Sequence, residues 1–136
     1  MQLNPYIHFN GNCEAALKYY QKVLGARIEA MLRFAEGPPE MQMPAEYKDK
    51  IMHALVTIDG EALMASDAPP GHFETPQGFS VALQLQDPAD AERKFKALAD
   101  GGSVTMPFGQ TFFSQGFGMC TDRFGIPWMV NCPAGM

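Results

Sequence analysis

The sequence predicts an α+β fold made of two successive modules, each with the order strand, helix and three further strands. Two segments carry apolar residues at helical spacing, one over residues 13–24 and one that starts at Pro88, and a glycine follows each, Gly25 and Gly101. Segments rich in strand-forming residues lie before and after each helical segment. The order of elements therefore repeats along the chain, although the two halves share little sequence identity.

The first module is expected to span about residues 1–67. Asn12 is placed to cap the first helix, and Asp59-Gly60 lies between two alternating segments as the turn of a β-hairpin. The elements are expected, in the order strand, helix and three strands, over residues 3–10, 13–24, 27–34, 51–58 and 61–66. Segment 36–49 contains several prolines and methionines, which predicts a loop that covers a pocket or a partner subunit, or one that is mobile.

A proline-rich linker over about residues 68–77 separates this module from the second, which is expected to span about residues 78–136. Asp87 followed by Pro88 predicts a helix start, because aspartate caps helices and proline suits their first turn. The strands of this module are expected over residues 79–86, near Val104, over 112–121 and in the closing stretch to residue 131. Together the modules are expected to form a single domain of 136 residues, long enough to bury a core.

The closing stretch is the most informative part of the second module. Asp122 and Gly125 bracket a tight turn, with Gly125 free to adopt a positive φ. Pro127 lacks an N–H, so the strand that follows is expected at a sheet edge or to enter its sheet late. Alternation sorts the side chains of this strand to two faces, with Trp128, Val130 and Cys132 on one and Met129 and Asn131 on the other.

Alternation also predicts which side chains face away from the helices. In segment 79–86 the odd-numbered residues are apolar and are expected to pack on the helix, so the even-numbered ones face the other side. A mostly apolar pocket with a few polar groups is typical of small-molecule sites. The predicted ligand-binding residues are His53, Met64, Ser80, Gln84, Phe112, Met129 and Asn131. The alternative is that Gln84 and Asn131 only satisfy neighbouring backbone groups.

Composition narrows the class of protein. The net charge of −5 and the absence of a basic patch disfavour nucleic acid and anionic membranes as partners. No apolar run has the length of a membrane span, and the chain is expected in the cytoplasm. Three cysteines without a C-x-x-C spacing predict neither a disulfide framework nor a zinc site. Cys13 lies in the apolar stripe of the first helix, which favours a packing role over a nucleophilic one.

Two motifs resemble one known superfamily. Residues 16–25 are similar to the first helix of the vicinal oxygen chelate superfamily, which contains glyoxalase I, bleomycin-resistance proteins and extradiol dioxygenases. Asp122-Arg123-Phe124-Gly125 followed by Trp128 resembles its D-x-x-G-x-x-W ending. Asn4-Pro5-Tyr6 and Gly116-Phe117-Gly118 resemble its PhnB-like branch, which sometimes carries a 3-demethylubiquinone-9 3-methyltransferase label, although no glycine-rich S-adenosylmethionine loop is visible.

The resemblance implies two curved mixed sheets around a concave pocket, with a helix on the outer face of each sheet, and it implies a homodimer. Metal-dependent relatives use four His, Gln or Glu ligands, one from each of four strands. Counted from the flanking motifs, these positions fall at Pro5, Leu63 or Met64, Ser80 and Met129. Since none of these is a useful ligand for a hard metal, no metal or other cofactor is expected.

The expected function is therefore the binding of a small, largely apolar molecule in a pocket without the usual metal quartet. One alternative is a metal-dependent lyase, isomerase or dioxygenase that uses His8 and His53 with Asp67 or Glu61. A second alternative is a non-catalytic dimeric interaction module. The sequence assigns no catalytic residue and names neither a ligand nor a pathway.

Overall fold

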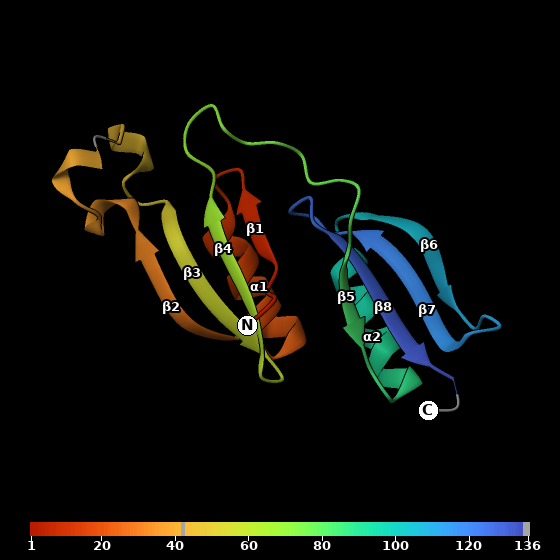
Figure 1. Cartoon of the computed structure of the whole chain (residues 1–136). Helices are drawn as coiled ribbons and strands as arrows, with labels where there is room; N and C mark the ends of the chain where they lie inside the picture. The colour runs from red at the N-terminus through yellow and green to blue at the C-terminus, as the bar shows by residue number, and fades with distance from the viewer. Residues whose placement is uncertain (42, 135–136) are drawn as a thin grey trace. The chain divides into compact units, whose positions relative to one another are not determined.

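The computed structural model describes residues 1–41 and 43–134. These residues form two compact units, residues 1–74 and the described part of 75–136. Within this described part of the chain, each unit contains a four-stranded sheet and one α-helix (Figure 1). None of the described helices is long and apolar enough to cross a membrane.

The first unit has the predicted order of elements. They are β1 (Tyr6–Phe9), α1 (Cys13–Leu24), β2 (Arg27–Arg33), β3 (Ile51–Ile58) and β4 (Glu61–Asp67). The sheet has the order β1-β4-β3-β2, in which β1 is parallel to β4 and the other neighbours are antiparallel. Asp59 and Gly60 join β3 to β4 with φ values of 50° and 82°. Both values are positive, as a two-residue type I′ turn requires, so the hairpin prediction is confirmed.

The second unit repeats this topology. Its elements are β5 (Val81–Gln84), α2 (Pro88–Ala99), β6 (Ser103–Gly109), β7 (Ser114–Thr121) and β8 (Pro127–Pro133). The sheet has the order β5-β8-β7-β6, with β5 parallel to β8 and the other neighbours antiparallel. Each strand therefore has a counterpart in the first unit, β5 for β1 and β8 for β4. The α+β fold of two βαβββ modules is confirmed.

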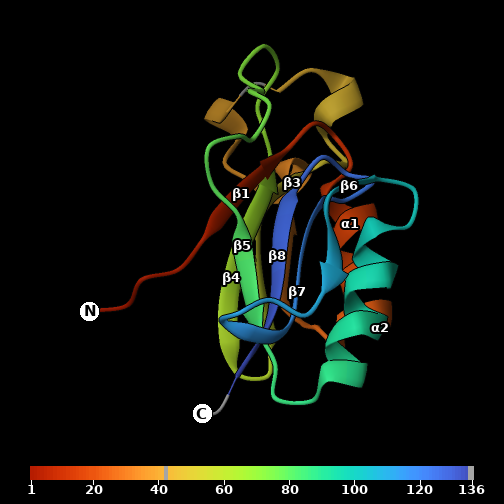
Figure 2. The ribbon, with the colours of Figure 1, turned by 90° about the vertical axis from the view of Figure 1, so that its right-hand side faces the viewer.

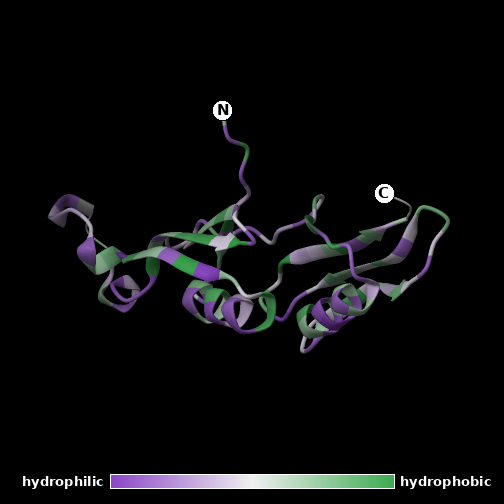
Figure 3. Ribbon diagram, turned by 90° about the horizontal axis from the view of Figure 1, so that it is seen from below, coloured by the Kyte–Doolittle hydropathy of each residue, from purple (hydrophilic) through white to green (hydrophobic). Residues whose placement is uncertain are grey.

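Each helix packs on one face of its own sheet, as the ribbon shows when the view of Figure 1 is turned by 90° about the vertical axis (Figure 2). On α1 the residues Ala16, Leu17 and Tyr20 are completely buried, and on α2 the same holds for Ala91 and Leu98. Colouring by hydropathy shows hydrophilic stretches on both helices (Figure 3), as expected for helices with one buried stripe. The apolar spacing seen in the sequence thus corresponds to the helix–sheet contact.

The two helices begin differently. Asp87 caps α2 as predicted, since its side chain accepts a hydrogen bond from the backbone N–H of Ala89 at 3.2 Å. Asn12 makes no such bond at the start of α1, and its Oδ1 atom is buried without a partner in the part of the chain that the structure describes. The backbone N–H of Cys13 donates instead to Oδ1 of Asp67, at 2.9 Å. The prediction that the Asn12 side chain caps α1 is therefore wrong, because a carboxylate from the end of β4 takes this role.

Several strand boundaries differ from the sequence-based expectation. β1 and β5 are shorter than expected, and β5 begins at Val81, so Ser80 precedes it. β6 is longer than the short strand expected near Val104. Pro127 is the first residue of β8, which lies inside its sheet between β5 and β7. A proline is tolerated there because the first residue of a strand can do without an N–H donor.

The turn before β8 is built around one buried carboxylate. Asp122, only 3% exposed, accepts hydrogen bonds from the backbone N–H groups of Phe124 and Ile126, each at 2.9 Å. Its second oxygen accepts the indole N–H of Trp128 at 2.8 Å. Trp128 is completely buried. The predicted roles of Asp122 in the turn and of Trp128 in the core are confirmed, and the two are directly linked.

Two glycines of β7 allow aromatic rings to pack closely on the sheet. A Cβ added at Gly116 would lie 2.4 Å from the ring of Phe108, and one at Gly118 would lie 2.7 Å from the ring of Phe95. Phe95 belongs to α2, and its ring centroid is 5.6 Å from that of Phe108. The Gly-x-Gly pattern therefore serves helix–sheet packing.

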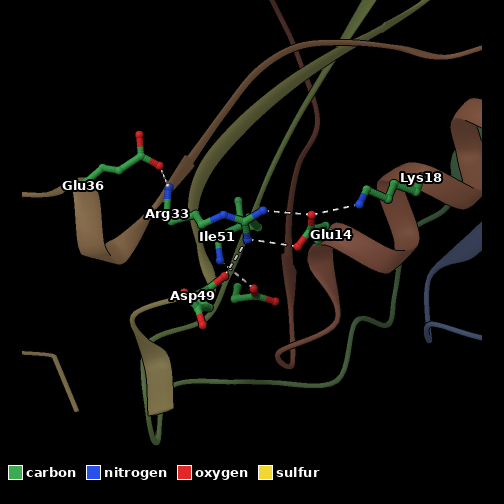
Figure 4. Close-up of polar contacts among 7 residues, drawn as sticks. Glu14, Lys18, Arg33, Glu36, Asp49 and Ile51 are labelled. Atoms are coloured by element: carbon green, nitrogen blue, oxygen red, sulfur yellow. Dashed lines mark hydrogen bonds and ion pairs between the residues drawn. The ribbon is translucent and has the colours of Figure 1, made fainter. Parts of the chain in front are cut away.

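The segment between β2 and β3 is held at both ends. It contains three short 3₁₀ turns, Phe34–Glu36, Pro39–Met41 and Ala45–Tyr47, while Gln42 and the Met41 side chain lie outside the described residues. Arg33 binds both carboxylate oxygens of Glu14 at 2.9 Å and the backbone oxygen of Asp49 at 2.8 Å (Figure 4). These bonds tie the segment to α1. The expectation that this segment covers a pocket or a partner stays a prediction.

Candidate functional site

Each sheet has one face that packs on its helix and an opposite face, which is called here the open face. In β8 the side chains of Trp128, Val130 and Cys132 are completely buried on the helix side. Met129 and Asn131 alternate with them and lie on the open face, as predicted. The candidate ligand-binding residues can therefore be located by strand register.

Open-face residues of the second unit form rows that cross the sheet. The first row contains Gln84, Asn131 and Phe117. Within it, the Asn131 amide donates to Oε1 of Gln84 at 2.9 Å. Oδ1 of Asn131 is buried and has no hydrogen-bond partner within residues 1–41 and 43–134. The two side-chain amides thus hydrogen-bond to each other. The alternative, in which they only pair with neighbouring backbone groups, is therefore wrong.

The second row of this face is rich in methionine. Ala82, Met129, Met119 and Met106 are register partners across β5, β8, β7 and β6. Met129 and Met119 are half-buried, and Met106 is exposed. Thioether side chains are flexible and polarisable, so such a row can adapt to apolar molecules of different shapes. It gives the amide pair an apolar neighbourhood.

The two remaining predicted residues of this unit lie at its margins. Ser80 is half-buried and directly precedes β5. Phe112 lies in the turn between β6 and β7 and is 98% exposed. Its ring contacts that of Phe113 edge-on at 5.2 Å, and Phe113 contacts Phe117 in the same way at 5.2 Å. A series of rings therefore leads from the first row to the tip of the turn.

The open face of the first unit holds the other two predicted residues, His53 and Met64. His8 pairs with Ser66, and continuing the β3–β4 register places Ser66 opposite His53. The next row contains Tyr6, Met64 and Leu55. The hydroxyl of Tyr6 lies 3.3 Å from Nδ1 of His53.

The aromatic rings of this face are also close. The ring of Tyr6 lies 5.0 Å from that of His8 and 5.8 Å from that of His53, centroid to centroid. Ser66, in the row between the two histidines, is only 5% exposed. The first unit thus groups two imidazoles, a phenol and a serine hydroxyl on one face.

The residues do not fit the metal quartet of the superfamily that the sequence resembles. Met64 and Met129 occupy matching positions of the two sheets, each opposite a residue of β1 or β5, and thioethers are poor ligands for hard cations. Alternation from Tyr6 puts Pro5 on the helix side with Ile7. No group of three or more His, Cys, Asp or Glu side chains suited to a metal occurs among the described residues.

The alternative set of His8 and His53 with Asp67 also fails as a metal site. The Asp67 carboxylate is 2% exposed and accepts the backbone N–H groups of Cys13 and Ile51, at 2.9 and 2.8 Å. Asp67 is the register partner of Phe9, which is buried on the helix side of the sheet, whereas the two histidines lie on the open face. Glu61 is at the start of β4, opposite Ile58 in the hairpin. Neither carboxylate is placed to complete the set.

The cysteines have the properties of core residues. Cys13, Cys120 and Cys132 are free and buried. Burial, and next the charge of Asp67, raise the pKa of the Cys13 thiol well above its ordinary value. Burial likewise raises the pKa of Cys120 to about 11. Neither thiol forms an appreciable amount of thiolate at neutral pH, which agrees with the predicted packing role of Cys13.

Sequence reasoning missed part of the first unit's face. Tyr6 and Ser66 were not expected among the site residues, and His8 was considered only as a metal ligand. Two signals were available in the sequence. The Asp59-Gly60 turn fixes the register of β3 against β4, which places Ser66 opposite His53. Alternation in β1 places Tyr6 and His8 on one face.

Comparison with known proteins gives consistent results. The model of the "Glyoxalase/Bleomycin resistance protein/Dioxygenase superfamily" matches residues 2–130. The chain is 40% identical to protein YjdN of Escherichia coli strain K12, over 96% of this chain and 95% of that one. The crystal structure of protein PA1353 from Pseudomonas aeruginosa is 51% identical, with a TM-score of 0.89 and 98% of each chain covered.

A more distant structure is similar in fold alone. It is described as a putative 3-demethylubiquinone-9 3-methyltransferase, PhnB protein, from Bacillus cereus. It is 23% identical to this chain, with a TM-score of 0.81, and 97% of this chain and 99% of that one are covered.

Proposed function

The chain belongs to the glyoxalase/bleomycin resistance protein/dioxygenase superfamily, and from this premise we propose that it binds a small, largely apolar molecule without the usual metal quartet. The proposed binding surfaces are the open faces of its two sheets. The residues predicted to bind the ligand are His53 and Met64 in the first unit, and Ser80, Gln84, Phe112, Met129 and Asn131 in the second.

The amide pair of Gln84 and Asn131 carries this proposal. The methionine row lies on one side of the pair, and Phe117 is the register partner of Asn131, so the two polar groups have apolar neighbours. Gln84 is exposed, and its amide nitrogen keeps its hydrogens for a further bond. Oδ1 of Asn131 is buried and has no donor among the described residues, so the accessible polar group of the pair is the Gln84 amide. An apolar molecule with one hydrogen-bond acceptor would match this N–H group.

The proposal is tested with a library of small apolar molecules that each carry one amide or hydroxyl group. Binding is measured by ligand-observed NMR and by the shift in melting temperature. Gln84→Ala is expected to weaken the best ligands about fivefold or more, the loss of one hydrogen bond. Gln21→Ala, at an exposed position of α1, is the matched control and should leave affinity unchanged. Equal affinity for both variants would remove Gln84 from the site.

We also propose that the protein is a homodimer that works in the cytoplasm. Large apolar side chains on and beside the edge strand β6 support pairing, since Phe112 is 98%, Val104 50% and Met106 44% exposed. Three free, buried cysteines suit a reducing compartment. Light scattering on a sizing column should give twice the chain mass of 15.0 kDa, and Phe112→Ser should shift the mass towards the monomer. A monomeric wild type would contradict this proposal.

A further inference from the structure

We propose that the row of His8, Ser66 and His53 on the first unit's open face, together with Tyr6, binds the carboxylate of a small organic acid. This inference rests on the proposed function and specifies which chemical group is recognised and where. Three features of this face favour a carboxylate: a surplus of hydrogen-bond donors, no acidic side chain in the two rows, and an apolar row beside the donors.

Tyr6 and His53 form a pair that keeps one donor free for a ligand. The hydroxyl of Tyr6 lies 3.3 Å from Nδ1 of His53, and either group can be the donor. If the phenol donates, Nε2 of a neutral His53 carries the ring proton and remains a donor. If Nδ1 donates, the phenol keeps its own O–H. In both arrangements the pair retains one N–H or O–H for a ligand.

His8 and Ser66 lie beside this pair and add further donors. The side chains of His8 and Ser66 make no hydrogen bond among the described residues, and the ring of His8 lies 5.0 Å from that of Tyr6, centroid to centroid. A neutral imidazole still carries one N–H, and a serine hydroxyl carries one O–H. Ser66 is only 5% exposed as a residue, but its hydroxyl oxygen is not among the described side-chain atoms that are both fully buried and unpaired, so a ligand can still reach it. Donors are therefore in surplus along the row.

The charges near this row also favour an anion. The two rows of this face contain Tyr6, His8, His53, Leu55, Met64 and Ser66, they continue into β2 with Leu32 and Ala30, and none of these residues is acidic. Asp67 directly follows Ser66, but its carboxylate binds backbone N–H groups on the helix side. Glu29 is bound to Thr57 near the other end of β3. An oxyanion in the row would thus meet donors without meeting a carboxylate.

An apolar row beside the donors can hold the body of the ligand. Leu55 and Met64 form the neighbouring row, directly beside the donors. Hydrogen bonds to an ionised acceptor are about twice as strong as those between neutral groups. A carboxylate on an apolar body would place its oxygens at the donors and its chain on Leu55 and Met64. A neutral alcohol of the same length would keep the apolar contact but would accept only the weaker hydrogen bonds of a neutral oxygen.

The experiment uses the full chain and the probes hexanoate, hexanol and hexylphosphonate. The chain contains three histidines, so a carbon-13 spectrum of the imidazole groups gives one signal each for His8, His53 and His72. Hexanoate is expected to move the signals of His8 and His53 and to leave that of His72, which lies in the linker, unchanged. Ser66→Ala is expected to weaken hexanoate about fivefold or more, whereas His72→Gln should have no effect.

Each other outcome has a definite meaning. If hexanol binds as tightly as hexanoate at these histidines, the carboxylate inference fails while the proposed binding of an apolar molecule stands. If hexylphosphonate binds much more tightly than hexanoate, the class of head group is wrong. If no probe moves the His8 and His53 signals, the site itself is wrong, and the proposed function is then judged by the Gln84 variants alone. A backbone NMR spectrum of Ser66→Ala verifies that the variant is folded.

Discussion

Replacing Asp122 by alanine should destabilise the second unit strongly. The carboxylate is 3% exposed and accepts three hydrogen bonds, at 2.9, 2.9 and 2.8 Å. Two of the three donors, the backbone N–H of Ile126 and the indole N–H of Trp128, are buried, and the third, at Phe124, is partly buried.

An unpaired buried donor costs about 1–3 kcal/mol, so two such donors and a partly buried one give an expected loss of about 3–5 kcal/mol. That is a large part of the stability of a domain, which is about 5–15 kcal/mol. Asp122→Asn should cost less, because its oxygen can still accept the two backbone N–H groups. Its NH₂ group would face the indole N–H of Trp128, so we expect a loss of about 1–3 kcal/mol from that single bond.

Urea unfolding at neutral pH measures both variants. Far-UV circular dichroism follows the fold, and the fluorescence of the only tryptophan reports on the site itself. In a double-mutant cycle, Asp122→Asn combined with Trp128→Phe should show a coupling of about 1–2 kcal/mol. Asp122→Ala within about 1 kcal/mol of wild type, or no coupling in the cycle, would refute the role assigned to this carboxylate.

Three further predictions concern packing, pH and thiol reactivity. Gly118→Ala should lower the free energy of unfolding by about 1–3 kcal/mol, because its Cβ would lie 2.7 Å from the ring of Phe95. In the same urea assay the control Gly109→Ala, whose Cβ would have no described atom within 4 Å, should lie within about 0.5 kcal/mol of wild type. Hydrogen bonds from an arginine and next from a lysine lower the pKa of Glu14 from 4.5 to about 2. Wild type should therefore be more stable than Glu14→Gln above pH 4.5, and this difference in the free energy of unfolding should disappear as the pH falls towards 2. A difference that stays unchanged at low pH in acid titrations would contradict this. Cys13 and the other two cysteines should react with a thiol reagent at neutral pH only after unfolding, and rapid labelling of the native protein would show that the thiols are accessible.

Local signals in the sequence predicted much of the fold. Gly25 ends α1 with a φ of 71°, the left-handed conformation that glycine adopts without strain. The Asp59-Gly60 turn requires positive φ at both residues, so the dipeptide alone indicated the hairpin. Alternation in β8 was read correctly because Trp128 and Val130 are apolar enough to define the buried face.

Features that depend on residues distant in sequence were not predicted. Asn12 has the right side chain for a cap, but Asp67, 54 residues after Cys13, binds the free N–H of α1 instead. Sequence alone gives no distance between these residues, so the local preference of Asn12 was followed.

The candidate site shows the same limit. Gln84 and Asn131 were placed on one face by alternation, and this holds because each strand keeps its period of two residues. The contact of Tyr6 with His53 depends on the parallel register of β1 and β4, which a helix and two strands separate in the chain. No turn fixes that register, so the approach of Tyr6 and His8 to His53 and Ser66 became visible only in the structure.

Native mass spectrometry of freshly purified protein, with metal analysis of the same sample, tests most directly whether the open faces bind a small molecule without a metal quartet. We expect an added mass of a small organic molecule that disappears on denaturation, and metal well below one ion per chain. Stoichiometric zinc, nickel, manganese or iron, held through residues of the strands and with no organic molecule bound, would contradict the proposed function.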